Sequence, residues 1–128
     1  AELAVDYMAG AFDDFPLQEQ IWLVALDRKN HPIYRHRLSI GTLTSTCVHP
    51  REIFRALLLT SGVASYFLIH QHPSGDPTPS QADITVTRTV REASKIMDIP
   101  LADHLIVGFR EADPTGRGFY SFREAGLL

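Results

Sequence analysis

Residues 65–83, SYFLIHQHPSGDPTPSQAD, contain a predicted strand, two histidines, a proline-rich loop and the start of a helix. The residues before the histidines are aromatic and apolar, which is typical of a buried strand. Side chains two positions apart in a strand share a face, so His70 and His72 are expected to point the same way. The loop favours neither helix nor strand, whereas Ser80 is a good N-cap. Asp83 then falls in a first helical turn that can fold back over the strand end.

Two imidazoles and one carboxylate can bind a catalytic zinc ion, which uses three protein ligands and keeps a fourth position for water. His70, His72 and Asp83 would supply these ligands for one Zn²⁺ in each chain. A simpler interpretation exists, because Ser80 and Asp83 are close to a capping-box pattern and acidic side chains favour helix N-termini without any metal. The residues alone leave both interpretations open.

The wider pattern resembles known families. The arrangement His-x-His-Pro, six residues, Ser, two residues, Asp is similar to the JAMM (MPN-type) metalloprotease signature, and His70, His72 and Asp83 match its zinc ligands. Nearly the whole chain resembles the bacterial RadC family, through the segments His72–Ser80, Gly41–Leu43, Val48–Phe54 and Asp103–Gly108. One departure is Gln71, where the RadC pattern usually has Asn. As the residue between two ligands, Gln71 is expected to point away from the metal.

The resemblance implies a zinc-dependent hydrolase acting on the amide bonds of a peptide or isopeptide substrate. In JAMM enzymes a glutamate at the entrance to the first central strand acts as general base and acid, and Glu19, just before Gln20–Leu26, matches that place. Glu52 is the alternative base, because it also lies in a RadC-like motif, although beside Arg51 it could simply form a surface ion pair. Ser80 matches the signature serine and would donate a hydrogen bond to the developing oxyanion.

Other catalytic patterns fit the sequence poorly. Ser74 follows a histidine closely but lacks the G-x-S-x-G context of a serine hydrolase, and no H-E-x-x-H helix is present. Cys47 is the single cysteine, so the P-C-x-x-C pattern of zinc deaminases cannot be formed. His104 is expected to form a hydrogen bond near the site rather than bind the metal. Three further histidines are expected in turns or on the surface: His31, His36 and His49.

Two functional alternatives accompany the hydrolase hypothesis. The RadC name is linked weakly to DNA repair, but the net charge of −3 is unusual for a protein that binds nucleic acid through its own surface. The basic cluster Arg35–Arg37 is expected to be a solvated face. The second alternative is a JAMM scaffold that binds partners without turnover, although all three ligand positions are occupied.

The composition indicates one globular domain over residues 1–128 in the cytoplasm. The 128 residues are 45% apolar, and neither a membrane span nor a basic signal-peptide start is recognisable. Cys47 cannot form an internal disulfide, which suits a reducing compartment, and is expected to be a small strand residue. RadC-like chains often carry an upstream helical region, which is not found in this sequence.

Hydrophobic periodicity predicts alternating strands and helices. Helices are expected over residues 1–12, 50–59 and 80–97, with Gly62 suited to the C-cap of the second. Strands are expected over 20–26, 33–46 with a break at Gly41, 65–69 and 104–109. Residues 111–118 are expected to form a surface loop, and 119–128 a short strand or helical tail. The sum is an α/β fold, a three-layer α/β/α sandwich with a mixed sheet of about five strands. The resemblance implies JAMM/MPN-like, cytidine-deaminase-like topology.

Overall fold

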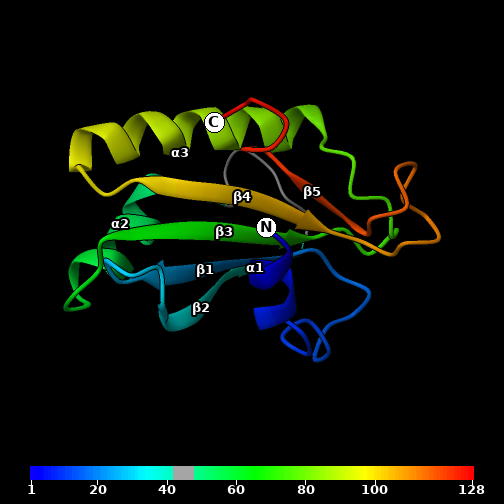
Figure 1. The fold of residues 1–128 in the computed structure, drawn as a ribbon, viewed down its shortest axis with the longest axis horizontal. Helices are drawn as coiled ribbons and strands as arrows, with labels where there is room; N and C mark the ends of the chain where they lie inside the picture. Colours follow the sequence, from blue (N-terminus) through cyan, green and yellow to red (C-terminus); the bar gives the residue numbers. More distant parts are fainter. Residues whose placement is uncertain (42–47) are drawn as a thin grey trace.

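A five-stranded mixed sheet lies at the centre of the computed structural model, which describes residues 1–41 and 48–128 (Figure 1). The strand order is β2-β1-β3-β4-β5, in which only the β3–β4 pair is parallel. The predicted α/β fold with a mixed sheet is therefore confirmed. The elements in chain order are α1 (Glu2–Tyr7), β1 (Gln20–Leu26), β2 (Pro32–Ile40), α2 (Pro50–Leu58), β3 (Ser65–Gln71), α3 (Gln81–Met97), β4 (Leu101–Val107) and β5 (Phe119–Ser121).

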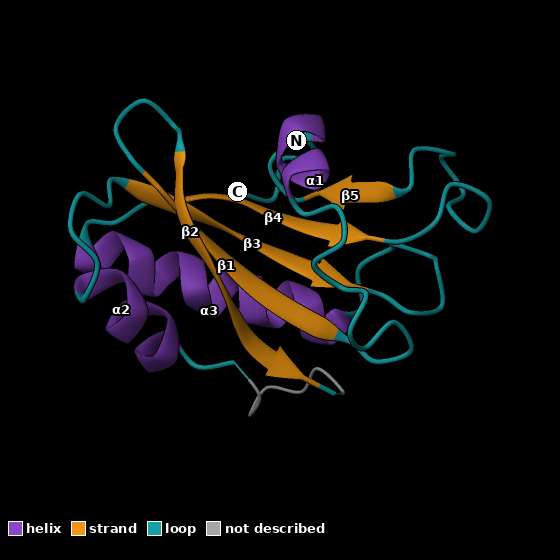
Figure 2. Cartoon of the chain, turned by 90° about the horizontal axis from the view of Figure 1, so that it is seen from below, coloured by secondary structure: helices purple, strands orange, loops and turns teal. Residues whose placement is uncertain are grey.

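Helices cover both faces of the sheet, with α1 on one side and α2 and α3 on the other (Figure 2). Burying both faces explains why β1 and β3 are almost continuously apolar instead of alternating. On the α2–α3 side the core contains alternate residues of β1 and β3, such as Leu23 and Leu68, packed with Ile53 and Val90. On the α1 side Met8 joins residues from the opposite faces of the same strands.

Several predicted boundaries differ from the observed ones. The strand expected over 33–46 ends at Ile40, and residues 42–47, including Cys47, lie outside the described residues. The prediction that Gly62 caps α2 is wrong, because the helix ends at Leu58 with Leu59 as its C-cap. The strand expected to begin at His104 starts three residues earlier, at Leu101. None of the helices among the described residues is long and apolar enough to cross a membrane.

Two arginines of β2 attach the N-terminal segment to the sheet. The guanidinium carbon of Arg35 lies 5.7 Å from the ring centroids of both Tyr7 and Trp22. That of Arg37 lies 5.2 Å from the Phe15 ring and 5.7 Å from the Trp22 ring. These cation–π contacts show that the basic cluster is more than a solvated face, because it links the segment before β1 to Trp22 within β1.

The loop after β3 is held closely against the end of β4. The amide of His72 donates to the carbonyl of Val107 over 2.9 Å, and that of Phe109 donates to Gly75 over 2.7 Å. A Cβ atom on Gly108 would lie 2.0 Å from the carbonyl oxygen of Gly75, which explains why glycine is needed there. The contact positions His72 and the loop that leads to α3.

We expect Gly108→Ala to lower the free energy of unfolding by about 3 kcal/mol, the upper end of the range for overpacking, because backbone atoms must move apart. Urea unfolding followed by circular dichroism would measure the change. Gly62→Ala is the control, since a Cβ there meets no described atom within 4 Å and only its φ of +82° is unfavourable. That substitution should cost about 1 kcal/mol. Equal losses for the two variants would contradict the steric explanation.

Candidate metal centre

His70 and His72 occupy the end of β3 on the side of the sheet that faces α3. Tyr66 and Leu68 belong to the core on the α2–α3 side, and His70 follows them with the same alternation. His70 is completely buried, whereas the side chain of His72, one residue beyond the strand, is 11% exposed. Their ring centroids lie 4.7 Å apart, with the planes nearly perpendicular. The expectation that they share a face is therefore in agreement with the structure.

Asp83 is brought to these histidines by the first turn of α3. Ser80 and Asp83 form a capping box, in which the Ser80 amide donates to Oδ2 of Asp83 over 2.7 Å and the Asp83 amide donates to the Ser80 hydroxyl over 3.1 Å. The same carboxylate lies 3.2 Å from Nδ1 of His70 and 3.1 Å from Nε2 of His72. Helix capping and contact with both imidazoles are thus properties of one buried carboxylate, and neither excludes the other.

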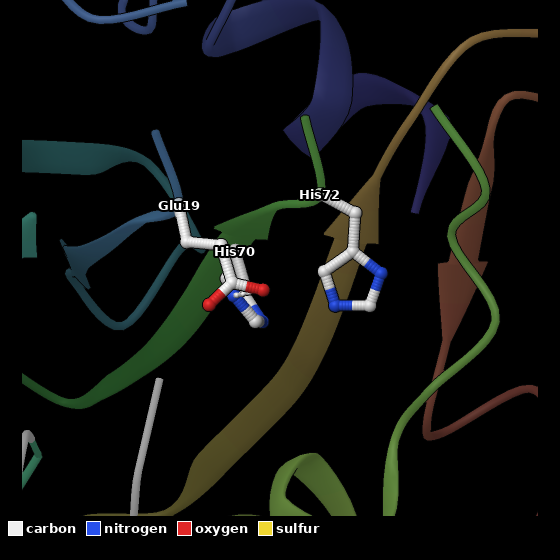
Figure 3. Close-up of side chains that lie close together, drawn as sticks. All are labelled: Glu19, His70 and His72. Carbon is white, nitrogen blue, oxygen red and sulfur yellow. Dashed lines mark ion pairs between the residues drawn. The ribbon is translucent and has the colours of Figure 1, made fainter. Parts of the chain in front are cut away.

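Glu19 approaches the histidines from the residue before β1 (Figure 3). Its Oε1 lies 3.9 Å from Nε2 of His70, and its side chain is 29% exposed. One potential ligand atom from each of Glu19, His70 and His72 can be chosen so that all three lie within 4.8 Å of one another. The rival Glu52 is in the first turn of α2, where its carboxylate lies 3.4 Å from the guanidinium of Arg51. Among the described residues, the group that could hold a metal includes Glu19 and not Glu52.

Several buried polar atoms at this site have no hydrogen-bond partner among the described residues. These atoms are the two ring nitrogens of His70 and Oδ1 of Asp83. Oδ1 lies 3.2 Å from Nδ1 of His70, but the two atoms are not oriented for a hydrogen bond. Leaving such atoms unsatisfied is unfavourable, so their concentration at one place needs an explanation. Two ligand atoms on a tetrahedral zinc ion stand about 3.4 Å apart, because each bond is about 2.1 Å long. Asp83 stands at about this spacing from Nδ1 of His70 and from Nε2 of His72, through one carboxylate oxygen each, whereas Glu19 approaches the other ring nitrogen of His70. Among the described residues, the group whose ligand atoms all lie within 4.8 Å of one another consists of Glu19, His70 and His72. The types of donor gathered here therefore fit a divalent metal ion.

The charges of the site favour a carboxylate that is ready to bind a cation. Burial raises the pKa of Asp83, but contacts with His70, His72 and the Ser80 amide outweigh it and hold that pKa well below its usual range. Burial lowers the pKa of His72, but Asp83 and the carbonyl of Asp76 raise it more, so the net shift is upward. Asp83 is therefore deprotonated at neutral pH, as a metal ligand must be.

A backbone contact selects the tautomer of His72. Its Nδ1 lies 2.9 Å from the carbonyl oxygen of Asp76, which can only accept a hydrogen bond, so Nδ1 carries the proton. Nε2 lies 3.1 Å from the Asp83 carboxylate, which can only accept, so without a metal this nitrogen also carries a hydrogen and donates it. A bound metal ion would take the place of that hydrogen and use the Nε2 lone pair. The hydrogen bond from Nδ1 is of the kind that commonly orients metal-binding histidines. The loop residue Asp76 thereby helps to aim His72.

Ser80 and Gln71 take positions that agree with their sequence-based interpretations. Ser80 is exposed, and its oxygen accepts the capping bond from Asp83, which leaves its hydroxyl hydrogen available to donate. Its role toward an oxyanion stays a prediction. The amide of Gln71 donates to the carbonyl of Pro16 over 3.2 Å and lies close to Gln20, so it is directed away from the histidines.

Two supporting residues could not be identified from the sequence pattern. Gln20 is fully buried, and its amide nitrogen donates to the carbonyls of Phe12 and Phe15 over 3.0 Å each, next to Glu19. The only feature of the sequence that could have indicated this role is the presence of a polar residue at the start of an otherwise apolar strand. Thr87 is a buried residue of α3 whose hydroxyl forms a hydrogen bond with Nδ1 of His104.

Comparisons with known proteins place these residues in a family. The family model described as RadC-like JAB domain matches residues 1–127. Relatives named UPF0758 protein include one from Pelodictyon phaeoclathratiforme, 41% identical over 123 residues, which are 96% of this chain and 51% of the relative. One from Geobacillus kaustophilus is 43% identical over 114 residues, 89% and 47% of the two chains. One from Syntrophomonas wolfei is 50% identical over 91 residues, which are 71% of this chain and 38% of the relative. The chain spans about half the length of the first two relatives.

Proposed function

This chain belongs to the RadC-like JAB domain family, and we propose that it is a metal-dependent hydrolase that cleaves amide bonds in peptide or isopeptide substrates. The observation that carries the proposal is the convergence of two histidines and two carboxylates, with buried imidazole nitrogens that have no hydrogen-bond partner among the described residues. These groups come from the entrance of β1, the end of β3 and the first turn of α3. Such a set is suited to one Zn²⁺ ion.

His70, His72 and Asp83 would hold the ion. When bound, zinc would lower the pKa of a water molecule and polarise a substrate carbonyl. Glu19 would accept a proton from the attacking water and deliver it to the leaving amine. Ser80, which keeps a hydroxyl hydrogen, would donate it to the developing oxyanion.

The two carboxylates are assigned different roles because their surroundings differ. Asp83 is 1% exposed, contacts both imidazoles and is held by the backbone of the capping box, which suits a fixed ligand. Glu19 is 29% exposed and stands farther from His70, at 3.9 Å. A partly exposed carboxylate can exchange protons with water and substrate, which a general base has to do.

Metal analysis and chelation test the proposed function. Purified protein incubated with zinc and then dialysed should contain about one zinc per chain. It should hydrolyse members of a mixed library of fluorogenic peptide and isopeptide substrates, measured as an increase in fluorescence. A chelator should abolish this hydrolysis, and added zinc should restore it. Failure to retain a divalent ion would contradict the metal centre. Retention of zinc without turnover of any substrate would contradict the hydrolase and favour the partner-binding scaffold.

A further inference from the structure

His104 is a buried histidine that the proposed chemistry does not use. It lies within β4, next to β3, and its side chain is completely inaccessible to solvent. Its Nδ1 is 2.5 Å from the hydroxyl of Thr87 on α3. The Thr87 hydroxyl is in turn 2.7 Å from the backbone carbonyl oxygen of Asp83, one helical turn earlier. A continuous path of hydrogen bonds therefore runs from the sheet to the backbone of the carboxylate residue.

The direction of these hydrogen bonds follows from the groups involved. The Asp83 carbonyl can only accept, so the Thr87 hydroxyl donates its hydrogen there. The Thr87 oxygen then accepts from Nδ1–H of His104, which makes Nδ1 the protonated nitrogen. Burial, together with the neighbouring His70, lowers the pKa of His104 to about 3, so the ring is neutral near pH 7.

The ring of His104 also packs beside the metal centre. It stacks on Phe122 with a centroid distance of 4.8 Å and an angle of 5°. Its centroid lies 6.3 Å from that of His70, with the planes inclined by 23°. Nε2 of His104 is buried and has no hydrogen-bond partner among the described residues. An apolar ring would fill the same space without burying that lone pair, so the donor at Nδ1 is the feature that distinguishes histidine here.

We propose that His104 and Thr87 are positioning residues of the metal centre, because they hold the first turn of α3 against β4 and so place Asp83 relative to His70. The inference rests on the proposed function, since it assigns a purpose to the geometry of the same site. Asp83 has a short side chain, so a displacement of its backbone moves the carboxylate almost equally. Groups that fix ligands in this way typically change metal affinity by about 10–100-fold when removed.

Substitutions at Thr87 test this role with a matched control on the same helix. Thr87→Val keeps the shape but removes the hydroxyl, whereas Thr87→Ser keeps the hydroxyl. Thr85→Val is the control, because the exposed Thr85 hydroxyl donates to the Gln81 carbonyl over 3.0 Å in the same i to i−4 pattern. The full chain would be measured for zinc affinity by competition with a chelating dye, for the visible absorption of bound Co²⁺, and for unfolding without metal.

Thr87→Val is expected to weaken zinc binding by about 10–100-fold and to alter the Co²⁺ spectrum, which reports ligand geometry. The zinc affinities of the Thr87→Ser and Thr85→Val proteins should stay within about threefold of that of the unsubstituted chain. Such a change is too small for the loss of a group that positions a ligand. A Thr87→Val protein that unfolds more easily but binds zinc with unchanged affinity and spectrum would overturn the proposal, since the bond would then be structural only.

Substitutions of His104 provide a second, independent comparison if Thr87→Val does not fold. His104→Asn places an amide donor near the position of Nδ1, whereas His104→Leu removes the donor. The His104→Asn protein should therefore bind zinc at least about tenfold more tightly than the His104→Leu protein. Equal affinities would overturn the proposal. If the unsubstituted chain took up no zinc, the proposed function would fail and the positioning role with it. If the unsubstituted chain bound zinc normally and the Thr87 and His104 variants bound it with the same affinity, only the positioning role would be contradicted.

Discussion

Replacing His72 by alanine is expected to reduce zinc affinity by more than about 100-fold, because even outer-shell partners of a metal ligand cost about 10–100-fold when removed. The substitution deletes the imidazole whose Nε2 lies 3.1 Å from Asp83. The Asp76 carbonyl cannot replace it, since that oxygen faces the other ring nitrogen. Zinc content after dialysis, together with competition against a chelating dye, would measure the change.

His36→Ala is the matched control for this experiment. His36 is an exposed residue of β2 and takes no part in the group of described residues that could hold a metal. Its removal should leave one zinc bound per chain. A His72→Ala protein that keeps zinc as tightly as the His36→Ala protein would show that the metal is bound elsewhere.

Replacing Glu19 by glutamine is expected to leave zinc bound and to reduce the rate of amide hydrolysis by about 10²–10⁴-fold, the contribution usual for a general base. Glutamine has nearly the shape of glutamate but cannot accept the proton. Steady-state hydrolysis of a substrate selected from the peptide and isopeptide library would be measured beside the zinc content of the same preparation.

The Glu52→Gln variant is the control that distinguishes Glu19 from Glu52 as the general base. Glu52 pairs with the exposed Arg51, so its replacement should change the rate by less than about threefold. If Glu52→Gln instead caused the large loss, Glu52 would be the base. If Glu19→Gln lost zinc as His72→Ala does, Glu19 would be a metal ligand, as its place beside both histidines also permits.

Local signals predicted the elements around the site closely. The continuous apolar run Gln20–Leu26 is β1 with the predicted bounds, and Ser80 caps α3 as its residue type indicated. Both predictions depended on interactions within a few residues: burial of a short apolar run, and a side-chain oxygen near the free amides of a helix start. The bounds of α2 were predicted to within one residue for the same reason.

The start of β4 was missed because its partners are distant in the sequence. Asp103 made the preceding residues look like a loop, since acidic side chains are uncommon in strands. In the structure its carboxylate accepts hydrogen bonds from the Ser121 hydroxyl over 2.5 Å and from the Arg123 amide over 3.0 Å. These contacts, about 20 residues away along the chain, allow the strand to begin before Asp103.

The sequence by itself determined the strand that carries His70, the helix start that carries Asp83 and the types of chemical group available, because these depend on spacing, capping and apolar runs within short segments. Only the tertiary structure decided which carboxylates meet the imidazoles. Glu19 reaches His70 because β1 pairs with β3, with Gln20 opposite Gln71, and that pairing depends on burial of both sheet faces. The link from His104 through Thr87 to Asp83 likewise exists only where α3 packs on β4, and no local pattern encodes such a distance.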